Sequence, residues 1–257
     1  MRVNSEKPAA PDQRILLRDQ SFSFACHPEV PCFTRCCHNA DMYLYPYDII
    51  RMKHRLDLSS DIFLEKYTHS AFRDNPYFPS VMLKMSEAEP HACPFLTDDG
   101  CSIYEDRPYS CRAYPLEPAM SRNSDLQRMV VYFLARHPYC LGHEQDRQWT
   151  VNEWILDQKM EPYHEMNAHW VAMDTIFRRN PWGEQGLESQ ALKMAYMACF
   201  NIDKFRGFVF ESSFLDRFNI SDNQMQEART SDEALMLLGF DWIRFILTRS
   251  GPLTIKT

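Results

Sequence analysis

Glycine is scarce in this chain: 7 of its 257 residues are glycine, while 16 are proline. Few glycines leave few positions for the tight turns of a hairpin-rich β fold, so the composition favours helices. Aromatic residues make up 13% of the chain and apolar residues 45%, which suits a folded protein with a sizeable core. The length fits one large domain or two small ones.

Positive charge is also sparse. The net charge is −7, and the chain has no run of lysine and arginine beyond pairs such as Arg178-Arg179. A protein that binds nucleic acid presents a basic face to the phosphates, so we expect no nucleic-acid partner. We expect a protein partner or a redox partner instead.

Long apolar runs are missing as well. No stretch approaches the roughly 18 apolar residues of a membrane span, and the first twenty residues lack the apolar core of a signal peptide. We therefore expect a cytoplasmic protein without a membrane span. In that reducing compartment, nine cysteines are expected to be ligands or redox groups rather than disulfides.

Cysteine is what the chain has in unusual density. Eight of the nine cysteines fall in three groups, which are Cys26, Cys32, Cys36 and Cys37; Cys93, Cys101 and Cys111; and Cys140. Thiolate sulfur is the preferred donor for zinc, copper(I) and iron–sulfur clusters. Eight thiols make two sites of four, or one four-thiolate site with further spare or catalytic thiols.

The adjacent cysteines Cys36 and Cys37 carry extra information. On an extended backbone neighbouring side chains point to opposite faces, so the pair would serve two metals. Otherwise the backbone turns there and both sulfurs bind one cluster. A single zinc ion would not need the second sulfur, so the surplus favours an iron–sulfur centre of the [4Fe-4S] type, with zinc as the alternative.

Three arginines lie beside these thiols in the sequence: Arg35, Arg107 and Arg112. Their guanidinium groups are candidates to bind the cofactor region, either through cluster sulfur or through loop carbonyls. The plain alternative is a loop arginine paired with Glu105 or Asp106. Five histidines also lie near the thiols, and we expect them to support the site rather than to bind metal: His27, His38, His91, His137 and His143.

The distribution of cysteine predicts three segments: a flexible leader at 1–20, a cysteine-cluster metal-binding domain at 21–148 and a helical region at 149–257. The last contains only Cys199, which lies in an apolar helical stretch and is expected in the core. The fold class predicted is mainly α, with a loop-rich, metal-stapled N-terminal half packed on a C-terminal helical bundle.

Several helix boundaries can be predicted. Pro46 suits a first helical turn, and Ser59 or Ser60 can cap a second helix that ends at Asn75-Pro76 and Phe78-Pro79. Capping boxes are predicted to begin at Thr150, Ser221 and Thr230. A stripe at helical spacing is expected to face the core: Tyr163, Met166, Trp170, Met173 and Phe177.

Taken together, the motifs around the thiols resemble the YkgJ-type cysteine-cluster family over roughly residues 22–142. The resemblance is carried by the run that ends in Cys36-Cys37, the helix start at Pro46…Asp48-Ile49, Cys93-Pro-Phe-Leu96, Cys101-Ser-Ile-Tyr104, Arg107-Pro108 and Cys111-Arg-Ala-Tyr-Pro115. That family is described as a zinc- or iron-chelating domain and includes flagellin lysine N-methylases.

The resemblance implies that the metal ligands are Cys26, Cys32, Cys36, Cys37, Cys93, Cys101 and Cys111, with Cys140 matching a later family cysteine. Three functions then compete. The first is an iron–sulfur protein in electron transfer or in assistance to a protein-modifying reaction. The second is a structural zinc module for protein interaction, and the third, by family analogy alone, is a lysine N-methyltransferase. Residues 149–257 show no glycine-rich loop for a methyl donor.

Overall fold

The computed structural model describes residues 14–17, 20–122 and 128–256. The chain divides into two interleaved units. The cysteine unit comprises Met1–Ala40, Met85–Ser102 and Tyr109–Glu161, and the helical unit comprises Asp41–Lys84, Ile103–Pro108 and Pro162–Thr257. The boundary predicted near residue 148 falls inside the last segment of the cysteine unit. Most of the predicted leader, including Pro8 and Pro11, lies outside the described residues.

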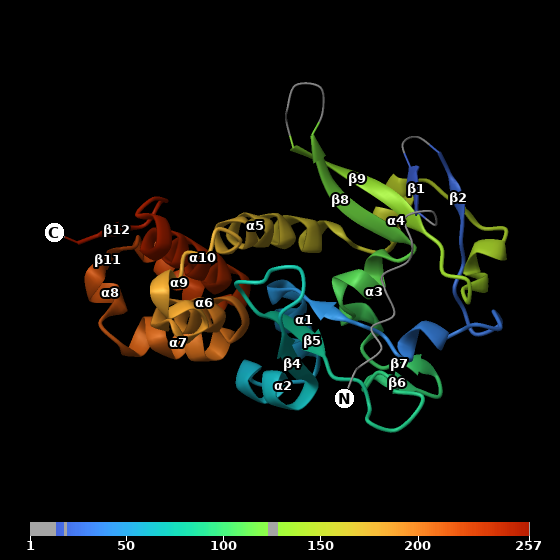
Figure 1. Ribbon diagram of the computed structural model, residues 1–257, viewed down its shortest axis with the longest axis horizontal. Helices are drawn as coiled ribbons and strands as arrows, with labels where there is room; N and C mark the ends of the chain where they lie inside the picture. Colours follow the sequence, from blue (N-terminus) through green and yellow to red (C-terminus); the bar gives the residue numbers. More distant parts are fainter. Residues whose placement is uncertain (1–13, 18–19, 123–127, 257) are drawn as a thin grey trace. The chain divides into compact units, whose positions relative to one another are not determined.

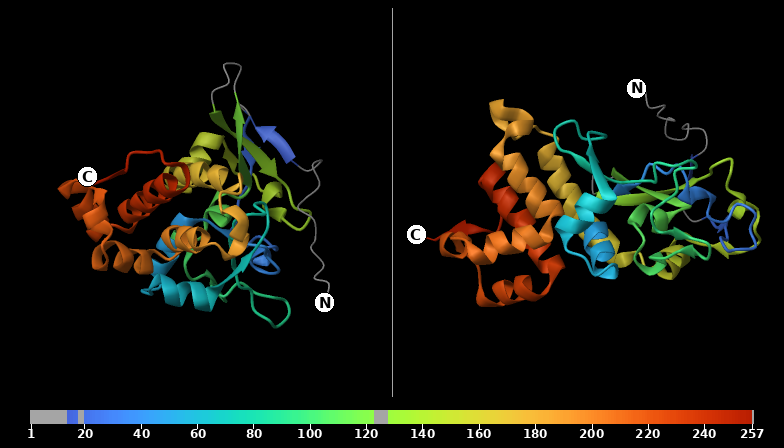
Figure 2. Two further views of the ribbon diagram at one scale, coloured as in Figure 1. Left: turned by 60° about the vertical axis from the view of Figure 1, so that its left-hand side comes forward. Right: turned by 90° about the horizontal axis from the view of Figure 1, so that it is seen from below.

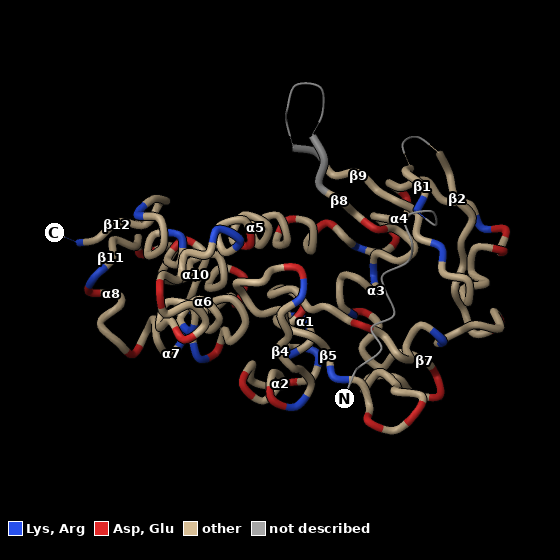
Figure 3. Tube along the Cα trace, viewed as in Figure 1, with Lys and Arg blue, Asp and Glu red and all other residues tan. Residues whose placement is uncertain are grey.

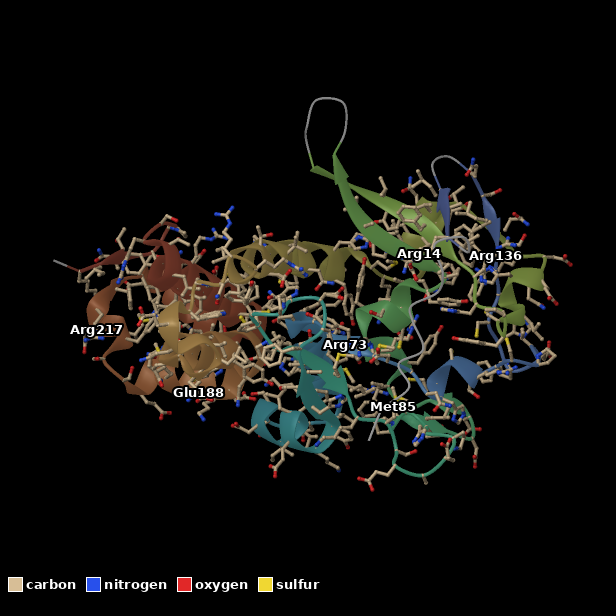
Figure 4. The ribbon with its side chains drawn as sticks, in the orientation of Figure 1. Arg14, Arg73, Met85, Arg136, Glu188 and Arg217 are labelled. Atoms are coloured by element: carbon tan, nitrogen blue, oxygen red, sulfur yellow. The ribbon has the colours of Figure 1, made fainter. Side chains whose placement is uncertain are left out.

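The cysteine unit holds short strands and two helices. Its elements are β1 (Arg14–Leu17), β2 (Phe22–Ser23), β6 (Leu96–Thr97), β7 (Gly100–Cys101), α3 (Tyr109–Ala113), β8 (Leu116–Arg122), β9 (Arg128–Ala135), β10 (Gln148–Trp149) and α4 (Val151–Asp157). The antiparallel sheet β1-β9-β8 is its largest (Figure 1). On this sheet Arg14, labelled in Figure 4, forms an ion pair with Glu117 on β8.

The cysteine unit also has a small aromatic core. The Trp154 ring meets the rings of Phe24 and Trp149 edge to face, with centroids 5.5 and 5.1 Å away. The Trp149 indole N–H donates to the carbonyl of Phe24, and the Trp154 indole N–H donates to that of Ala113. These bonds satisfy both buried indoles, and they tie β10 to the segment before Cys26 and α4 to the helix α3 that carries Cys111.

The helical unit is built mainly of helices with a small sheet. Its elements are β3 (Tyr43–Leu44), α1 (Pro46–Arg55), α2 (Ser60–Tyr67), β4 (Thr68–Ala71), β5 (Ser80–Leu83), α5 (Glu161–Phe177), α6 (Gln190–Phe200), α7 (Ile202–Glu211), α8 (Phe214–Arg217), β11 (Phe218–Asn219), α9 (Asp222–Thr230), α10 (Asp232–Thr248) and β12 (Thr254–Ile255). Figure 2 shows α6, α7 and α10 gathered side by side, and α10 contacts both of the others.

Aromatic rings fill the core of the helical unit. Four of the five residues in the predicted stripe on α5 are buried, while Met166 is half-buried. Trp170 packs against Phe200 of α6 and Phe240 of α10. Trp242 packs on α7 through Phe205, at a centroid distance of 5.5 Å. The prediction that the stripe faces the core is thus confirmed.

The predicted helix starts are mostly confirmed. Pro46 opens α1, the Ser59 hydroxyl caps α2, and capping boxes form at Thr150 and Ser221. The predicted end of the second helix is wrong. It stops at Tyr67 because the chain then pairs as β4 with β5, in the register Thr68↔Leu83 to Ala71↔Ser80.

The cap predicted at Thr230 is also wrong, by one residue. Ser231 caps α10, and its hydroxyl accepts from the backbone N–H of Ala234. Thr230 still belongs to α9, where its hydroxyl donates to the carbonyl of Gln226. Thr230 and Ser231 are both possible N-cap residues for α10, and the capping-box pattern in the sequence favoured the wrong one.

A buried network of charges joins α1, α7 and α10 within the helical unit. The Lys53 ammonium lies 3.0 Å from a carboxylate oxygen of Asp203 and 2.8 Å from one of Asp232. Asp232 also accepts from Arg206 and from His54. Lys53 and Asp232 are almost completely buried, so each needs its partners inside the protein.

The structure confirms a mainly helical fold class and adds small antiparallel sheets to it. Figure 3 shows acidic and basic residues mixed along α2 and α7. Among the described residues, none of the helices has the length and apolar character needed to cross a membrane.

Candidate metal centre

The vicinal cysteines sit in a tight turn. Arg35–Cys37 forms a single 3-10 turn, preceded by Thr34 with a left-handed φ of 63°, and the Cys37 N–H donates to the Thr34 carbonyl at 2.8 Å. The structure thus shows the turned backbone, not the extended one. The turn brings the two sulfurs together, since the Cys37 thiol donates a hydrogen bond to Cys36.

That hydrogen bond separates the acidities of the two thiols. The bond from Cys37 lowers the pKa of the Cys36 thiol to about 7, because it stabilises the Cys36 thiolate. The same bond, together with burial, raises the pKa of Cys37. A metal ion takes thiolates, so it would replace this shared proton and bind both sulfurs in their charged form.

The second cysteine segment lies directly against this turn. The Cys93 N–H donates to the Cys37 carbonyl at 2.7 Å, and His38 pairs with Ala92 as an isolated antiparallel bridge. The β6–β7 hairpin then brings Cys101 opposite Leu96, whose N–H donates to the Cys93 carbonyl at 3.0 Å. Backbone pairing alone therefore gathers Cys37, Cys93 and Cys101.

Cys111 joins them from α3. Negative charge on Cys93 or Cys111 further raises the pKa of Cys37, so all three thiols lie within electrostatic reach of one another's charge. Burial raises the pKa of Cys93, and charge on Cys101 and Cys36 adds to it. A bound cation would reverse these mutual repulsions.

The third cysteine segment meets the start of the first. The backbone N–H of Leu141 donates to the Cys32 sulfur at 3.1 Å, next to Cys140 in the chain. The Ala25 N–H donates to the carbonyl of Gly142 at 3.0 Å, which puts Cys26 beside the same turn. Cys26, Cys32 and Cys140 thus surround one short segment.

A ladder of flat side chains flanks this segment. The Tyr114 and His137 rings stack at 5.6 Å, His137 and Tyr139 stack at 5.2 Å, and the Arg35 guanidinium lies 5.7 Å from the centre of the Tyr139 ring. The Tyr114 hydroxyl hydrogen-bonds to Cys140. Burial raises the pKa of Cys140, and this bond opposes the rise.

Sequence reasoning did not single out Tyr114. It lies in the run Cys111-Arg-Ala-Tyr-Pro115, which was noted for its cysteine. The available signal was its place three residues after the candidate ligand Cys111 and directly before Pro115. A tyrosine so placed can donate to a sulfur ligand, which is a common support in metal sites.

The three candidate arginines occupy different surroundings. Arg112 is buried on α3 and donates to the carbonyl of Gln158. Arg107 belongs to the helical unit, where it donates to the carbonyl of Tyr104 and lies over that ring. Arg35 is exposed beside Tyr139. The role predicted for these arginines at the cofactor stays a prediction.

The thiols lie in neighbouring segments, but they are not arranged as the ligands of a metal ion. Across the described residues, no group of three or more histidine, cysteine, aspartate or glutamate side chains could hold a metal ion as placed. The residues present nevertheless fit a metal. All eight donors are cysteines of one unit that form no disulfide, and the ring nitrogen Nδ1 of His38, the residue after Cys37, is buried with no hydrogen-bond partner. Closure of the loops on a metal would be coupled to binding.

Cys199 differs from the other eight. It lies on α6 in the helical unit and is 3% exposed, and burial raises the pKa of its thiol. This is the expected environment of a cysteine that acts as a small apolar side chain.

Comparison with known families supports the assignment of this centre. Residues 25–141 match the CxxCxxCC family, whose description reads "Putative zinc- or iron-chelating domain". Over these residues the chain is similar to the domain that this family model describes. The match spans Cys26 to Cys140, so it confirms the resemblance drawn from the motifs and supports metal binding. No curated protein and no solved structure matches the chain.

Proposed function

We propose that the cysteine unit is an iron–sulfur protein domain that transfers electrons to or from a protein partner. The observation that carries the proposal is the vicinal pair Cys36-Cys37, which lies in one turn with Cys93 joined to Cys37 by a backbone hydrogen bond of 2.7 Å. One structural zinc ion uses four sulfurs, and this unit contains eight cysteines.

The residues around the thiols support a redox centre. Cys26, Cys36 and Cys111 are exposed, and the other clustered cysteines are half-buried. When bound, an iron–sulfur cluster supplies one-electron chemistry, and its potential depends on hydrogen bonds to sulfur and on exposure. Here Leu141 and Tyr114 donate such bonds, to Cys32 and Cys140. The exposed thiols would bring the centre near the surface, where a partner docks.

The experiment is to purify the protein without oxygen and to measure iron, acid-labile sulfide and the absorption spectrum. The proposal predicts iron and sulfide in equal amounts and a broad band near ~400 nm that bleaches on reduction. Colourless protein with stoichiometric zinc and no sulfide would replace the redox proposal with the structural zinc module. Protein that takes up neither metal after reconstitution would reject metal binding altogether.

A further inference from the structure

We infer that five residues of the cysteine unit, none of them a candidate ligand, hold the segment around Cys140 in place before a metal binds. Four form the ladder of flat side chains and the fifth is a glycine: Arg35, Tyr114, His137, Tyr139 and Gly142. They are positioning residues, because each would act on a metal through the placement of the cysteines. Their effect on the metal rests on the metal binding proposed above, whereas the placement itself can be measured in protein without metal.

The ladder takes its members from all three parts of the chain that carry the clustered cysteines. Arg35 lies beside the first group, Tyr114 beside the second, and His137 and Tyr139 beside the third. The planes of the Tyr114 and His137 rings differ by 15°, and those of His137 and Tyr139 by 4°, so both pairs are stacked. Stacked rings, and a guanidinium over a ring, attract each other beyond the burial of apolar surface. The ladder therefore links distant segments without a metal.

One end of the ladder is fixed to the aromatic core of the cysteine unit. The Tyr114 hydroxyl lies 3.3 Å from Nε2 of His143, and the Tyr114 ring meets the Phe24 ring edge to face at 5.7 Å. Phe24 is buried and also meets the ring of His143 edge to face, at 5.2 Å. Because this end is anchored, the rings stacked on it are held in place as well.

Gly142 lets the third cysteine segment approach the first. A Cβ atom at this position would lie 2.7 Å from the Phe24 ring and 2.8 Å from the carbonyl oxygen of Ala25, which no side chain can do. The close approach allows the Ala25 N–H to donate to the Gly142 carbonyl at 3.0 Å. One residue earlier, the Leu141 N–H donates to the Cys32 sulfur at 3.1 Å. Backbone contacts that need no metal therefore join the two segments.

This arrangement leaves part of the centre ready for a metal. Because the Cys32 sulfur already contacts the backbone next to Cys140, a metal that used both segments would not have to bring them together. Preorganised ligands lose less conformational entropy on binding, and residues that support ligands commonly change metal affinity by about 10–100-fold. The ladder and Gly142 should therefore raise the affinity for metal without changing how much metal the protein holds at saturation.

The first test measures how fast Cys32 is alkylated in metal-free, reduced protein, by peptide mapping. Tyr139→Leu removes the ring between His137 and Arg35, which should loosen the contact of Cys32 with Leu141 and make Cys32 react several-fold faster. Tyr139→Phe keeps the ring, so its Cys32 should react like that of the unmodified protein. Equal rates for Cys32 in Tyr139→Leu and in the unmodified protein would overturn the inference.

A glycine pair gives an independent comparison. The methyl group added by Gly142→Ala would meet Phe24, so this variant should also speed the alkylation of Cys32. Gly207→Ala on α7 is the matched control and should leave the rate unchanged, because its Cβ would meet only the flexible side chain of Glu211, at 3.7 Å. The same rate in both alanine variants would contradict the role assigned to Gly142.

One measurement on the unmodified protein needs no substitution, so it remains decisive if a variant fails to fold. In metal-free protein the amide of Leu141 should be protected from hydrogen exchange, because it donates to the Cys32 sulfur. The amide of Cys140, which donates to the His137 carbonyl at 2.9 Å, should be protected with it. Full exchange of both amides at the rate of an open chain would overturn the inference.

The second test measures metal affinity by competition with a chelator. Tyr139→Leu should bind metal about 10–100-fold more weakly, while Tyr139→Phe should bind it like the unmodified protein. Both variants should hold the full complement of metal at saturation. A smaller complement in Tyr139→Leu would contradict a positioning role, because loss of a ligand has that result.

The inference and the proposed function fail in different ways. Protein that binds no metal after reconstitution rejects the proposed function, while alkylation of Cys32 and exchange of Leu141 still decide whether the segment is held in place. Metal bound with equal affinity by all variants overturns the positioning role alone. Zinc bound without sulfide, and more weakly in Tyr139→Leu, supports the positioning role and rejects the redox proposal.

Discussion

The two units of this protein hold themselves together by different means. Among the largest fully buried side chains of the described residues, only Leu116 and Met160 belong to the cysteine unit, while Trp242, Phe63 and the others belong to the helical unit. A unit with a small core needs another source of stability, and a metal is the common one. The comparison shows that the large buried side chains concentrate in the helical unit, and we expect a metal held by the thiols to supply stability that the smaller core of the cysteine unit does not.

The largest effect should follow removal of the metal. Structural metal ions contribute on the order of 10 kcal/mol to the folding of small domains, so the cysteine unit should lose most of its amide protection when chelated. The helical unit should keep its protection, because its core contains no ligand. Hydrogen exchange followed by mass spectrometry reads both units in one sample. Loss of amide protection to the same extent in both units, or no loss in either unit, would contradict the comparison.

Loss of an aromatic ring from the core should destabilise the helical unit instead. Trp242→Ala removes a side chain that is 2% exposed and packs on Phe205. We expect it to lower the free energy of unfolding of the helical unit by about 3–5 kcal/mol, measured by denaturant titration. Leu187→Ala, at a residue that is 48% exposed, is the control and should change it by less than about 0.5 kcal/mol.

The buried charges of the helical unit predict the next effect. Asp232→Asn leaves Lys53 buried with only part of its compensating charge, which should cost about 3 kcal/mol. Glu188→Gln is the matched control, because it breaks the exposed pair with Lys193 and should cost less than about 1 kcal/mol. Thermal unfolding of the two variants side by side measures the difference.

The same network predicts a dependence on pH. Burial tends to raise the pKa of Asp232, but hydrogen bonds from Lys53, Arg206 and His54 outweigh it, and the net pKa lies below its ordinary value. A lowered folded pKa gives stability that is present above the unfolded pKa, near ~4, and is lost as the pH falls through the folded value. Asp232→Asn should therefore flatten the acid limb of the stability curve. An unchanged acid limb would contradict this.

The smallest effect concerns a helix cap. Ser231→Ala removes the hydroxyl that accepts from Ala234 and should cost about 1 kcal/mol. Thr230→Ala removes a hydroxyl that bonds only within its own helix and should cost less than half as much. The pair tests the one-residue shift between the expected and the observed start of α10. A larger cost at Thr230 would restore the original prediction.

Local signals in the sequence predicted the helical unit well. Pro46, Ser59 and Ser221 start helices as their chemistry requires, and four of the five stripe residues on α5 are buried. The errors arose where tertiary pairing overrides local preference. The strand that begins at Thr68 forms only because Leu83, fifteen residues later, is available to pair with it.

The candidate centre was predictable by residue type but not by arrangement. Cysteine spacing singled out eight thiols as candidate ligands, yet the contacts around them join residues far apart in the chain, such as Cys32 with Leu141. The interleaving of the two units could not be predicted from the sequence either, because it too depends on contacts between distant segments. Segments 41–84 and 103–108 belong to the helical unit although cysteine-unit segments lie on both sides of them in the sequence. Composition alone does not predict such an assignment.

One measurement tests the central claim most directly: the content of iron, zinc and acid-labile sulfide in protein purified without oxygen. The account predicts iron and sulfide in equal amounts, bound by the cysteine unit and retained in Cys199→Ser. Protein with a full complement of reactive thiols at Cys36, Cys93 and Cys140, and with no metal after reconstitution, would contradict it.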